Sequence, residues 1–249
     1  MRSALLALLF YSECRAVSTS IADASALLER VLPRAQYSER LMVGRRSQLG
    51  DEMVYRPGMI GSSSVDDALT YGEFDLKLFA QLVDRAIEPN AGSLSTTFVD
   101  VGSGVGRLVL AAACLWPDRF ARFTGVEKVA ALHDLALAAS ARAQLAQPCD
   151  FYCADAADVL AADGALADAD VLFAYSSAFA SEGDMLSDFS AMCGNCLRVG
   201  SRVITTDRRL LSVDGLWKFE LVDSIEGPNA ETGGVSTGYV HLVTQSKRA

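Results

Sequence analysis

The sequence is short of positive charge, of long apolar runs and of histidine, and each shortage excludes a class of protein. Its formal net charge is −9 and its pI is near 4.7. It therefore lacks the basic face of a nonspecific nucleic-acid binder, and we expect no strong nucleic-acid binding by the chain alone. No apolar run is long enough to span a membrane. The two histidines, His133 and His241, are too few to complete a zinc site with a cysteine pair, so we expect no bound metal.

The six cysteines are unevenly spread and form no disulfide framework for a chain of this length, which favours a reduced compartment. Cys193 and Cys196 have C-x-x-C spacing, but they lie at the end of a predicted helix. A redox pair would sit at a helix N-terminus, where the helix dipole lowers the thiol pKa. We therefore interpret this pair as structural.

With 51% hydrophobic residues, the 249 residues suffice for one sizeable α/β core and a small extension. We predict that residues 1–65 are a helical N-terminal extension, because Ile21–Leu32 carries a helical apolar stripe that Pro33 ends. We predict that residues 66–249 form a single domain.

The first eighteen residues leave two interpretations open. Arg2 precedes the apolar run Ala4–Phe10, and Ala16-Val-Ser18 is similar to a small-residue cleavage site, as in a targeting segment. The same residues would serve equally well as a first helix packed on the domain. The segment that follows is locally basic, and its arginines are Arg30, Arg34, Arg40, Arg45 and Arg46.

Beyond residue 66 the apolar pattern alternates between strands and helices. The predicted strands are Thr97–Val101, Phe123–Val126, Asp150–Cys153, Val171–Tyr175, Arg202–Thr206, Trp217–Val222 and Tyr239–Thr244. The predicted helices are Leu76–Ile87, Arg107–Leu115, Ala130–Leu145 and Met185–Leu197. This alternation indicates an α/β fold with a parallel sheet and helices on both faces. The last two strands have no helix between them, which predicts a closing antiparallel β-hairpin.

Three glycines at alternate positions follow the first strand, in Asp100-Val-Gly-Ser-Gly-Val-Gly106. Glycines let the chain turn tightly and leave no Cβ to block a ligand that lies over the turn. A dinucleotide-binding sequence would place its third glycine where this chain has Arg107. The pattern instead resembles motif I of class I S-adenosylmethionine (SAM) methyltransferases. Glu127, at the end of the next strand, has two acceptor oxygens that suit the hydroxyls of a ribose.

Two further segments resemble one particular family of class I methyltransferases. Tyr71-Gly-Glu73 before a helix, together with Gly125-Val-Glu-Lys128, resembles the disruptor-of-telomeric-silencing family. These are histone lysine methyltransferases with the class I fold rather than the SET fold. The resemblance runs from about Thr70 to Gln245. It implies a Rossmann-like class I sheet with a closing hairpin, and SAM as the cofactor.

The resemblance also implies which residues bind SAM. The Tyr71–Glu73 loop would close over the methionine part, Asp100 would hold the amino group, and Glu127 would accept the ribose hydroxyls. Asp155 would accept from the adenine N6 amine. The full set is Tyr71, Gly72, Glu73, Asp100, Gly102, Ser103, Gly104, Gly106, Arg107, Glu127, Lys128, Asp155 and Ala156.

The catalytic segment departs from the family sequence, which is Asn-Asn-Phe-Ala-Phe. Tyr175 and Ser176 replace the two asparagines and Ser177 replaces the first phenylalanine, whereas Phe179 is retained. Outside this segment, Phe74 stands where the family has threonine after Tyr-Gly-Glu, and Arg107 stands where it has glutamine. The strand at 235–241 resembles the one that carries the family's substrate-channel tyrosine. The implied catalytic residues are Tyr175, Ser176, Phe179 and Tyr239.

We therefore expect a SAM-dependent methyltransferase that acts as a monomer on a protein substrate, with a histone-type lysine as the first hypothesis. Methylation of a small molecule or a non-histone protein, and SAM binding without transfer, are the alternatives, because the catalytic segment is altered. The resemblance implies a nuclear protein, whereas a targeting segment at residues 1–18 would imply an organelle or secretion. The basic group available for nucleosome binding is Arg34, Arg40, Arg45 and Arg46.

Overall fold

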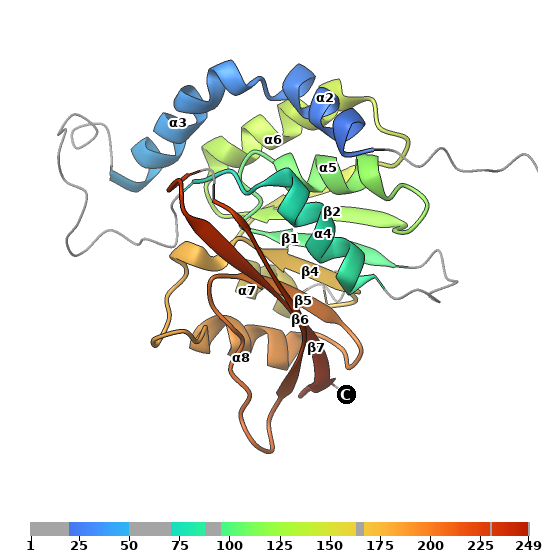
Figure 1. Cartoon of the computed structure of the whole chain (residues 1–249), viewed down its shortest axis with the longest axis vertical. Helices are drawn as coiled ribbons and strands as arrows, with labels where there is room; N and C mark the ends of the chain where they lie inside the picture. Colours follow the sequence, from blue (N-terminus) through green and yellow to red (C-terminus); the bar gives the residue numbers. More distant parts are fainter. Residues whose placement is uncertain (1–19, 50–70, 88–95, 163–166, 230, 249) are drawn as a thin grey trace, which may run out of the picture.

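A computed structural model describes residues 20–49, 71–87, 96–162, 167–229 and 231–248. In this part of the chain a seven-stranded sheet lies between two layers of helices (Figure 1). The predicted targeting segment and the predicted boundary at residue 65 lie outside these residues. No described helix is long and apolar enough to cross a membrane.

The sheet has the strand order β3-β2-β1-β4-β5-β7-β6. Strands β1 to β5 are parallel, whereas β7 runs antiparallel to both β5 and β6. This confirms the predicted parallel sheet with a closing hairpin. Because β1 lies between β2 and β4, the strand order reverses there, and ligands of such sheets bind outside the carboxyl ends at that point. The strands are β1 Thr97–Val101, β2 Arg122–Glu127, β3 Cys149–Cys153, β4 Val171–Ala174, β5 Arg202–Thr206, β6 Lys218–Pro228 and β7 Val235–Gln245.

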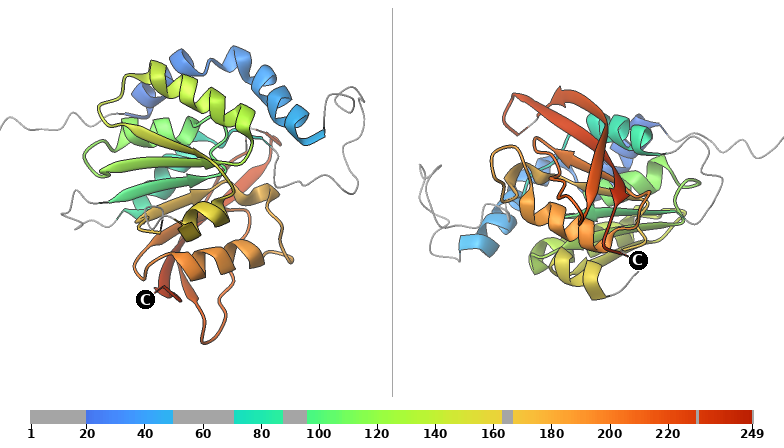
Figure 2. Two further views of the ribbon diagram at one scale, coloured as in Figure 1. Left: turned by 180° about the vertical axis from the view of Figure 1, so that it is seen from behind. Right: turned by 90° about the horizontal axis from the view of Figure 1, so that it is seen from below.

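The helices divide between the two faces of the sheet. Helices α4, α5 and α6 cover one face, and α2 and α3 of the extension pack over them. Helices α7 and α8 cover the other face, which the left view of Figure 2 shows from behind. The helices are α2 Ile21–Val31, η1 Arg34–Gln36, α3 Tyr37–Leu49, α4 Leu76–Ala86, α5 Arg107–Leu115, α6 Ala130–Ala143, α7 Ala156–Ala162, η3 Ser176–Ala178 and α8 Ser187–Cys196.

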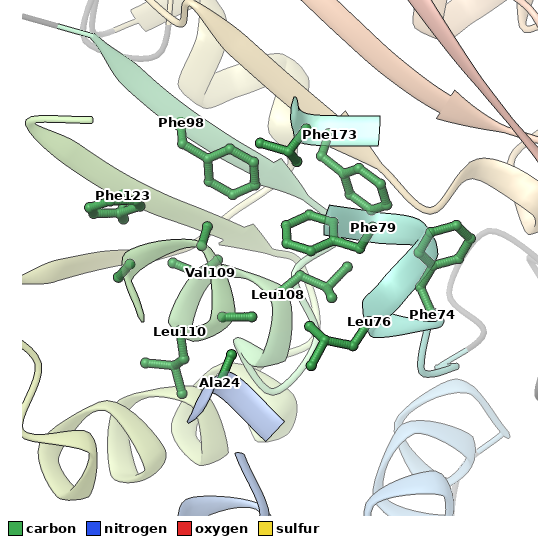
Figure 3. Close-up of a cluster of buried hydrophobic side chains, with 14 of the residues drawn as sticks. Ala24, Phe74, Leu76, Phe79, Phe98, Leu108, Val109, Leu110, Phe123 and Phe173 are labelled. Atoms are coloured by element: carbon green, nitrogen blue, oxygen red, sulfur yellow. The ribbon is translucent and has the colours of Figure 1, made fainter. Parts of the chain in front are cut away.

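The larger hydrophobic core lies between the sheet and α4 to α6 (Figure 3). Phe79 of α4 is fully buried, and its ring centroid lies 6.0 Å from that of Phe98 and 5.2 Å from that of Phe173. Both partner rings stand edge-on to it, the arrangement that aromatic quadrupoles favour. Ala24 of α2 belongs to the same cluster, so the N-terminal extension shares the core of the domain.

Local signals explain where these helices begin. At α2, Ser20 and Asp23 form a reciprocal capping box, in which each side chain accepts a hydrogen bond from the other residue's backbone N–H. At α4, the side chain of Asp75 accepts a hydrogen bond from the backbone N–H of Leu78 at 2.8 Å. Both caps satisfy N–H groups that the first helical turn leaves without a partner.

Three elements differ from the predictions. Helix α7 was not predicted, whereas α3 falls within the extension that was predicted to be helical, although it lacks an apolar stripe. Helix α7 forms because the Asp155 side chain accepts a hydrogen bond from the Ala157 N–H at 3.0 Å. The hairpin strands are also longer than predicted, β6 ending at Pro228 and β7 starting at Val235. Their tips carry exposed residues, so hydrophobic alternation does not mark them.

Candidate cofactor and active site

A cavity of about 370 Å³ opens at the carboxyl ends of β1, β2 and β4, where the sheet topology places a ligand. Most of the predicted site residues line it. They are Tyr71, Gly72, Glu73, Asp100, Gly102, Ser103, Gly104, Arg107, Glu127, Lys128, Asp155, Ala156, Tyr175 and Phe179. Gly106, Ser176 and Tyr239 are not among the lining residues.

The glycine turn after β1 needs glycine for two different reasons. Gly102 and Gly104 line the cavity with φ angles of 75° and 54°, in the left-handed region that side chains disfavour. A Cβ on Gly104 would lie 2.9 Å from the ring of Tyr71, so the turn and the Tyr71 loop pack directly on each other. Gly106 instead packs behind the turn, where a Cβ would lie 2.7 Å from the ring of Phe151.

Glu127 joins the end of β2 to this turn. Its carboxylate accepts hydrogen bonds from the backbone N–H of Gly104 at 2.8 Å and of Val129 at 2.7 Å. Burial raises the pKa of Glu127, and these backbone bonds oppose the rise. A carboxylate has about four acceptor positions, so acceptor capacity remains for a ligand such as a ribose diol.

Asp100, the predicted partner of the SAM amino group, is 3% exposed at the end of β1. Burial, with a smaller contribution from the nearby charge of Glu127, raises its pKa to about 8. A cation placed beside Asp100 would reverse this shift. The neighbouring Ser103 hydroxyl is buried and has no hydrogen-bond partner among the described residues. These features fit the amino-acid end of SAM. Asp100 is a buried acid that a cation would stabilise, the Ser103 hydroxyl is available for a hydrogen bond, and the glycines of the turn have no side chains to block a ligand.

Glu73 lies at the same end of the cavity, among three arginines. The side chain of Arg40 donates to its carboxylate through Nε at 3.1 Å and Nη2 at 2.6 Å. Arg34 approaches at 3.2 Å and Arg107 at 3.6 Å, and the Tyr71 hydroxyl donates to Oε1 at 2.8 Å. Burial alone would raise the pKa of Glu73, but the bonds from Arg40 and Tyr71 hold it below the usual value.

Asp155 and Ala156, the predicted adenine contacts, also line the cavity. Asp155 forms a 3.0 Å ion pair with Lys128, and its pKa is lowered by the hydrogen bond from Ala157 and by Lys128. Phe189 and Met192 of α8 also line the cavity, and no sequence motif marked them as site residues. Both residues belong to α8, and they reach the cavity only because α8 packs on this face of the sheet.

The segment after β4 forms the remaining wall. The ring of Tyr175 lies 5.1 Å from that of Phe74, and the ring of Phe179 lies 5.3 Å from that of Phe189. Burial raises the pKa of Tyr175, and the charges of Glu231 and Asp207 raise it further. Its hydroxyl therefore stays protonated at neutral pH.

Ser176 and Tyr239 lie away from the cavity for different reasons. Ser176 is fully buried, and its hydroxyl donates to the carbonyl of Thr206 at 3.0 Å, so it anchors the segment to β5. Tyr239 lies on β7, which is separated from β4 by β5, and its ring lies 6.3 Å from the ring of His241.

The predicted basic group for nucleosome binding has one buried member. Arg40 is 5% exposed and paired with Glu73, whereas Arg34 is paired with the same carboxylate but has a side chain that is 58% exposed. Arg40 is therefore removed from the predicted docking patch, and Arg34 remains at the surface. The side chains of Arg45 and Arg46 lie outside the description.

The family described as "Histone methylation protein DOT1" matches residues 64–212, more than half of the chain. Similar solved structures include the rRNA methyltransferase aviRa from Streptomyces viridochromogenes, with 16% identity, a TM-score of 0.49, and coverage of 70% of this chain and 86% of that one. Another is a ribosomal protein L11 methylase from Lactobacillus delbrueckii subsp. bulgaricus, with 15% identity, a TM-score of 0.46, and coverage of 70% and 81%. No curated protein matches the chain.

The matched segment contains the Tyr71–Glu73 loop, the glycine turn, Glu127 and the segment after β4. The chain therefore belongs to the DOT1 histone methylation family and is a SAM-dependent methyltransferase of the class I fold.

Proposed function

We propose that this enzyme transfers the methyl group of SAM to a lysine side chain of a protein substrate of the histone type. The observation that carries the proposal is the environment of Tyr175. Its ring and that of Phe74 form an aromatic wall of the cavity, and the charges of Glu231 and Asp207 act on its hydroxyl. Aromatic walls and nearby carboxylates suit the entry of a long, cationic side chain. The apolar walls then favour the loss of its proton.

For the cofactor, we propose that the predicted residues bind the groups that match their charges. Asp100 pairs with the ammonium group, Glu127 with the ribose hydroxyls, and Asp155 with the adenine amine. Three guanidinium groups lie around Glu73, and the carboxylates near them are those of Glu73, Glu231 and, beside Arg107, Asp75. Arg107 is the arginine of this group that lines the cavity, and we propose that it meets the SAM carboxylate.

The methyl transfer itself requires few further groups of the protein. SAM supplies a methyl group already activated on a sulfonium, so the protein must align a neutral amine with it and exclude water. The aromatic side chains of Phe74, Tyr175 and Phe179 lower the local polarity, which favours the neutral form of the amine. We assign the alignment of the amine and the exclusion of water to these rings, and we assign no side chain as a general base.

A non-nucleosomal protein substrate is the second candidate, because Arg34 and Arg40 are engaged with Glu73. The test is to incubate the enzyme with radiolabelled SAM and, separately, nucleosomes, free histones, a cell lysate and a metabolite extract. Asp100→Asn serves as the cofactor-site control. We expect label on histone lysines. Label on other lysate proteins supports the second candidate, and label confined to metabolites, or none despite SAM binding, overturns the lysine proposal.

We further propose that the extension and the domain form one structural unit in a nuclear protein. The shared core supports the first part, since Ala24, Leu27 and Leu28 of α2 are buried in the main cluster. Family membership supports the second. Imaging of a C-terminal fluorescent fusion tests the location, and an organellar signal would contradict it.

A further inference from the structure

The cofactor end of the cavity depends on a contact between distant parts of the chain. Glu73 belongs to the loop before α4, whereas Arg34 and Arg40 belong to the N-terminal extension. The side chains of Glu73 and Arg40 are 6% and 5% exposed, so this ion pair is withdrawn from water. A buried carboxylate is stable only while such partners hold it.

We infer that Arg40, supported by Arg34, is a positioning residue of the cofactor site, which it controls from the extension through Glu73. The inference rests on the proposed role of the Tyr71–Glu73 loop in binding SAM. Arg40 does not line the cavity and acts through Glu73, which does.

The contact chain from Arg40 to the glycine turn is continuous. Arg40 donates twice to Oε1 of Glu73, and the Tyr71 hydroxyl donates to the same oxygen. The Tyr71 ring in turn packs on Gly104, at a distance that leaves no room for a methyl group. If Glu73 moves, Tyr71 loses its anchor and no longer packs on the turn that lies beneath the cofactor.

The tip of the hairpin holds the same loop from the other side. Glu231, between β6 and β7, accepts a hydrogen bond from the backbone N–H of Glu73 at 2.9 Å. Its other carboxylate oxygen accepts from the hydroxyl of Tyr37, which belongs to the extension. The extension therefore reaches the loop directly through Arg34 and Arg40, and indirectly through Tyr37 and Glu231.

This contact is not what fastens the extension to the domain. Arg30 of α2 donates to the carbonyl of Ala143 at 2.9 Å, and Arg142 of α6 donates to the carbonyl of Val31 at 2.9 Å. The buried apolar face of α2 adds to this attachment. Arg30 thus offers a matched control, since it braces the extension without touching Glu73 or the cavity.

The test compares Arg40→Gln with Arg30→Gln in the full chain, by titration calorimetry with SAM and by thermal unfolding. We expect Arg40→Gln to weaken SAM binding at least tenfold, and Arg30→Gln to lower the melting temperature without changing SAM affinity. Arg40→Lys should restore part of the affinity, because it keeps the charge and loses the paired donors. Unchanged affinity in Arg40→Gln, or an equal loss in Arg30→Gln, would overturn the inference.

A second variant guards against loss of folding. If Arg40→Gln does not fold, Arg34→Gln removes a partner of Glu73 whose side chain is 58% exposed, and we expect a several-fold weaker SAM affinity. Unchanged affinity in Arg34→Gln would then refute the inference. The measured quantity is SAM binding, so a wrong lysine substrate would not affect this test. A wild-type protein that fails to bind SAM would instead refute the proposed function.

Discussion

Asp100 links cofactor binding to pH. In the cofactor-free protein its pKa is about 8, because the side chain is buried and lies near Glu127. Pairing with an ammonium group requires the ionised form, so below pH 8 SAM binding must release a proton. We expect SAM affinity to rise from pH 6 to 7.5, with nearly one proton released at pH 7. Calorimetry in two buffers of different ionisation enthalpy measures this release, and none at pH 7 would contradict the assignment.

The same side chain should destabilise the cofactor-free fold at neutral pH. Its folded pKa lies above the unfolded value of 3.8, so the folded state binds more protons between about pH 4 and pH 8. The free energy of unfolding therefore falls as pH rises through this window, by up to roughly 1.4 kcal/mol per unit. We expect Asp100→Asn to melt at a higher temperature than wild type at pH 8 and at a similar one at pH 4. If the melting temperatures of the two proteins change with pH in parallel, the prediction is refuted.

Gly104 is constrained by both its backbone and its neighbour. An alanine there would carry the strain of φ +54° and a Cβ 2.9 Å from the Tyr71 ring. Gly215 has φ +75°, and no atom of the described part of the chain lies within 4 Å of its Cβ position, so Gly215→Ala carries the backbone strain alone. We expect both variants to lose roughly 1–3 kcal/mol of stability. Only Gly104→Ala should also weaken SAM binding, at least tenfold by calorimetry, and equal affinities would show that Tyr71 does not need this packing.

At the scale of elements, the end of β5 braces the segment that follows β4. The Arg208 side chain donates to the carbonyls of Ser177 and Phe179, the latter at 3.2 Å. Asp207 accepts from the Ser177 hydroxyl and, at 2.9 Å, from the backbone N–H of Thr237. Serines in place of the family's asparagine and phenylalanine are thus held by contacts to β5 and β7, and the altered segment is well anchored.

Because Arg208 holds this segment, we predict that its loss impairs methyl transfer more than SAM binding. We expect Arg208→Gln to lower the rate of methyl transfer at least tenfold while SAM affinity changes less than threefold, because Arg208 holds Phe179 and does not line the cofactor cavity. The exposed neighbour Arg209 provides the control variant Arg209→Gln. For both variants, the methyl-transfer rate is measured with labelled SAM, and the SAM affinity is measured by calorimetry. Equal rates for the two variants would mean that the segment holds its position without Arg208.

At the scale of the whole molecule, charge separates free histones from nucleosomes. With a net charge of −9, the enzyme should attract basic proteins and be repelled by DNA. We expect free histones to bind and be methylated better than nucleosomes, with histone affinity falling as salt rises from 50 to 200 mM. Fluorescence anisotropy with labelled histones and labelled nucleosomal DNA measures both. Tight DNA binding would contradict the expectation and would place a basic surface beyond the residues described.

The sequence by itself determined the order of strands and helices, the glycine turn and the acids at the strand ends. Buried strands and apolar helix stripes are local patterns, and parallel strands bring their carboxyl ends to one edge of the sheet. Asp100, Glu127, Asp155 and Tyr175 could therefore be assigned to one site from the sequence, and all four line the cavity.

Only the tertiary structure decided how the cofactor end of the cavity is completed. Arg40 and Glu231 lie 33 and 158 residues from Glu73 along the chain, and no local pattern links them. The arginines of the extension looked like a surface patch because charge is usually solvated, whereas packing of α2 and α3 on the domain buries Arg40 against Glu73. Burial makes that pairing necessary, since an ion withdrawn from water must find its partner within the fold.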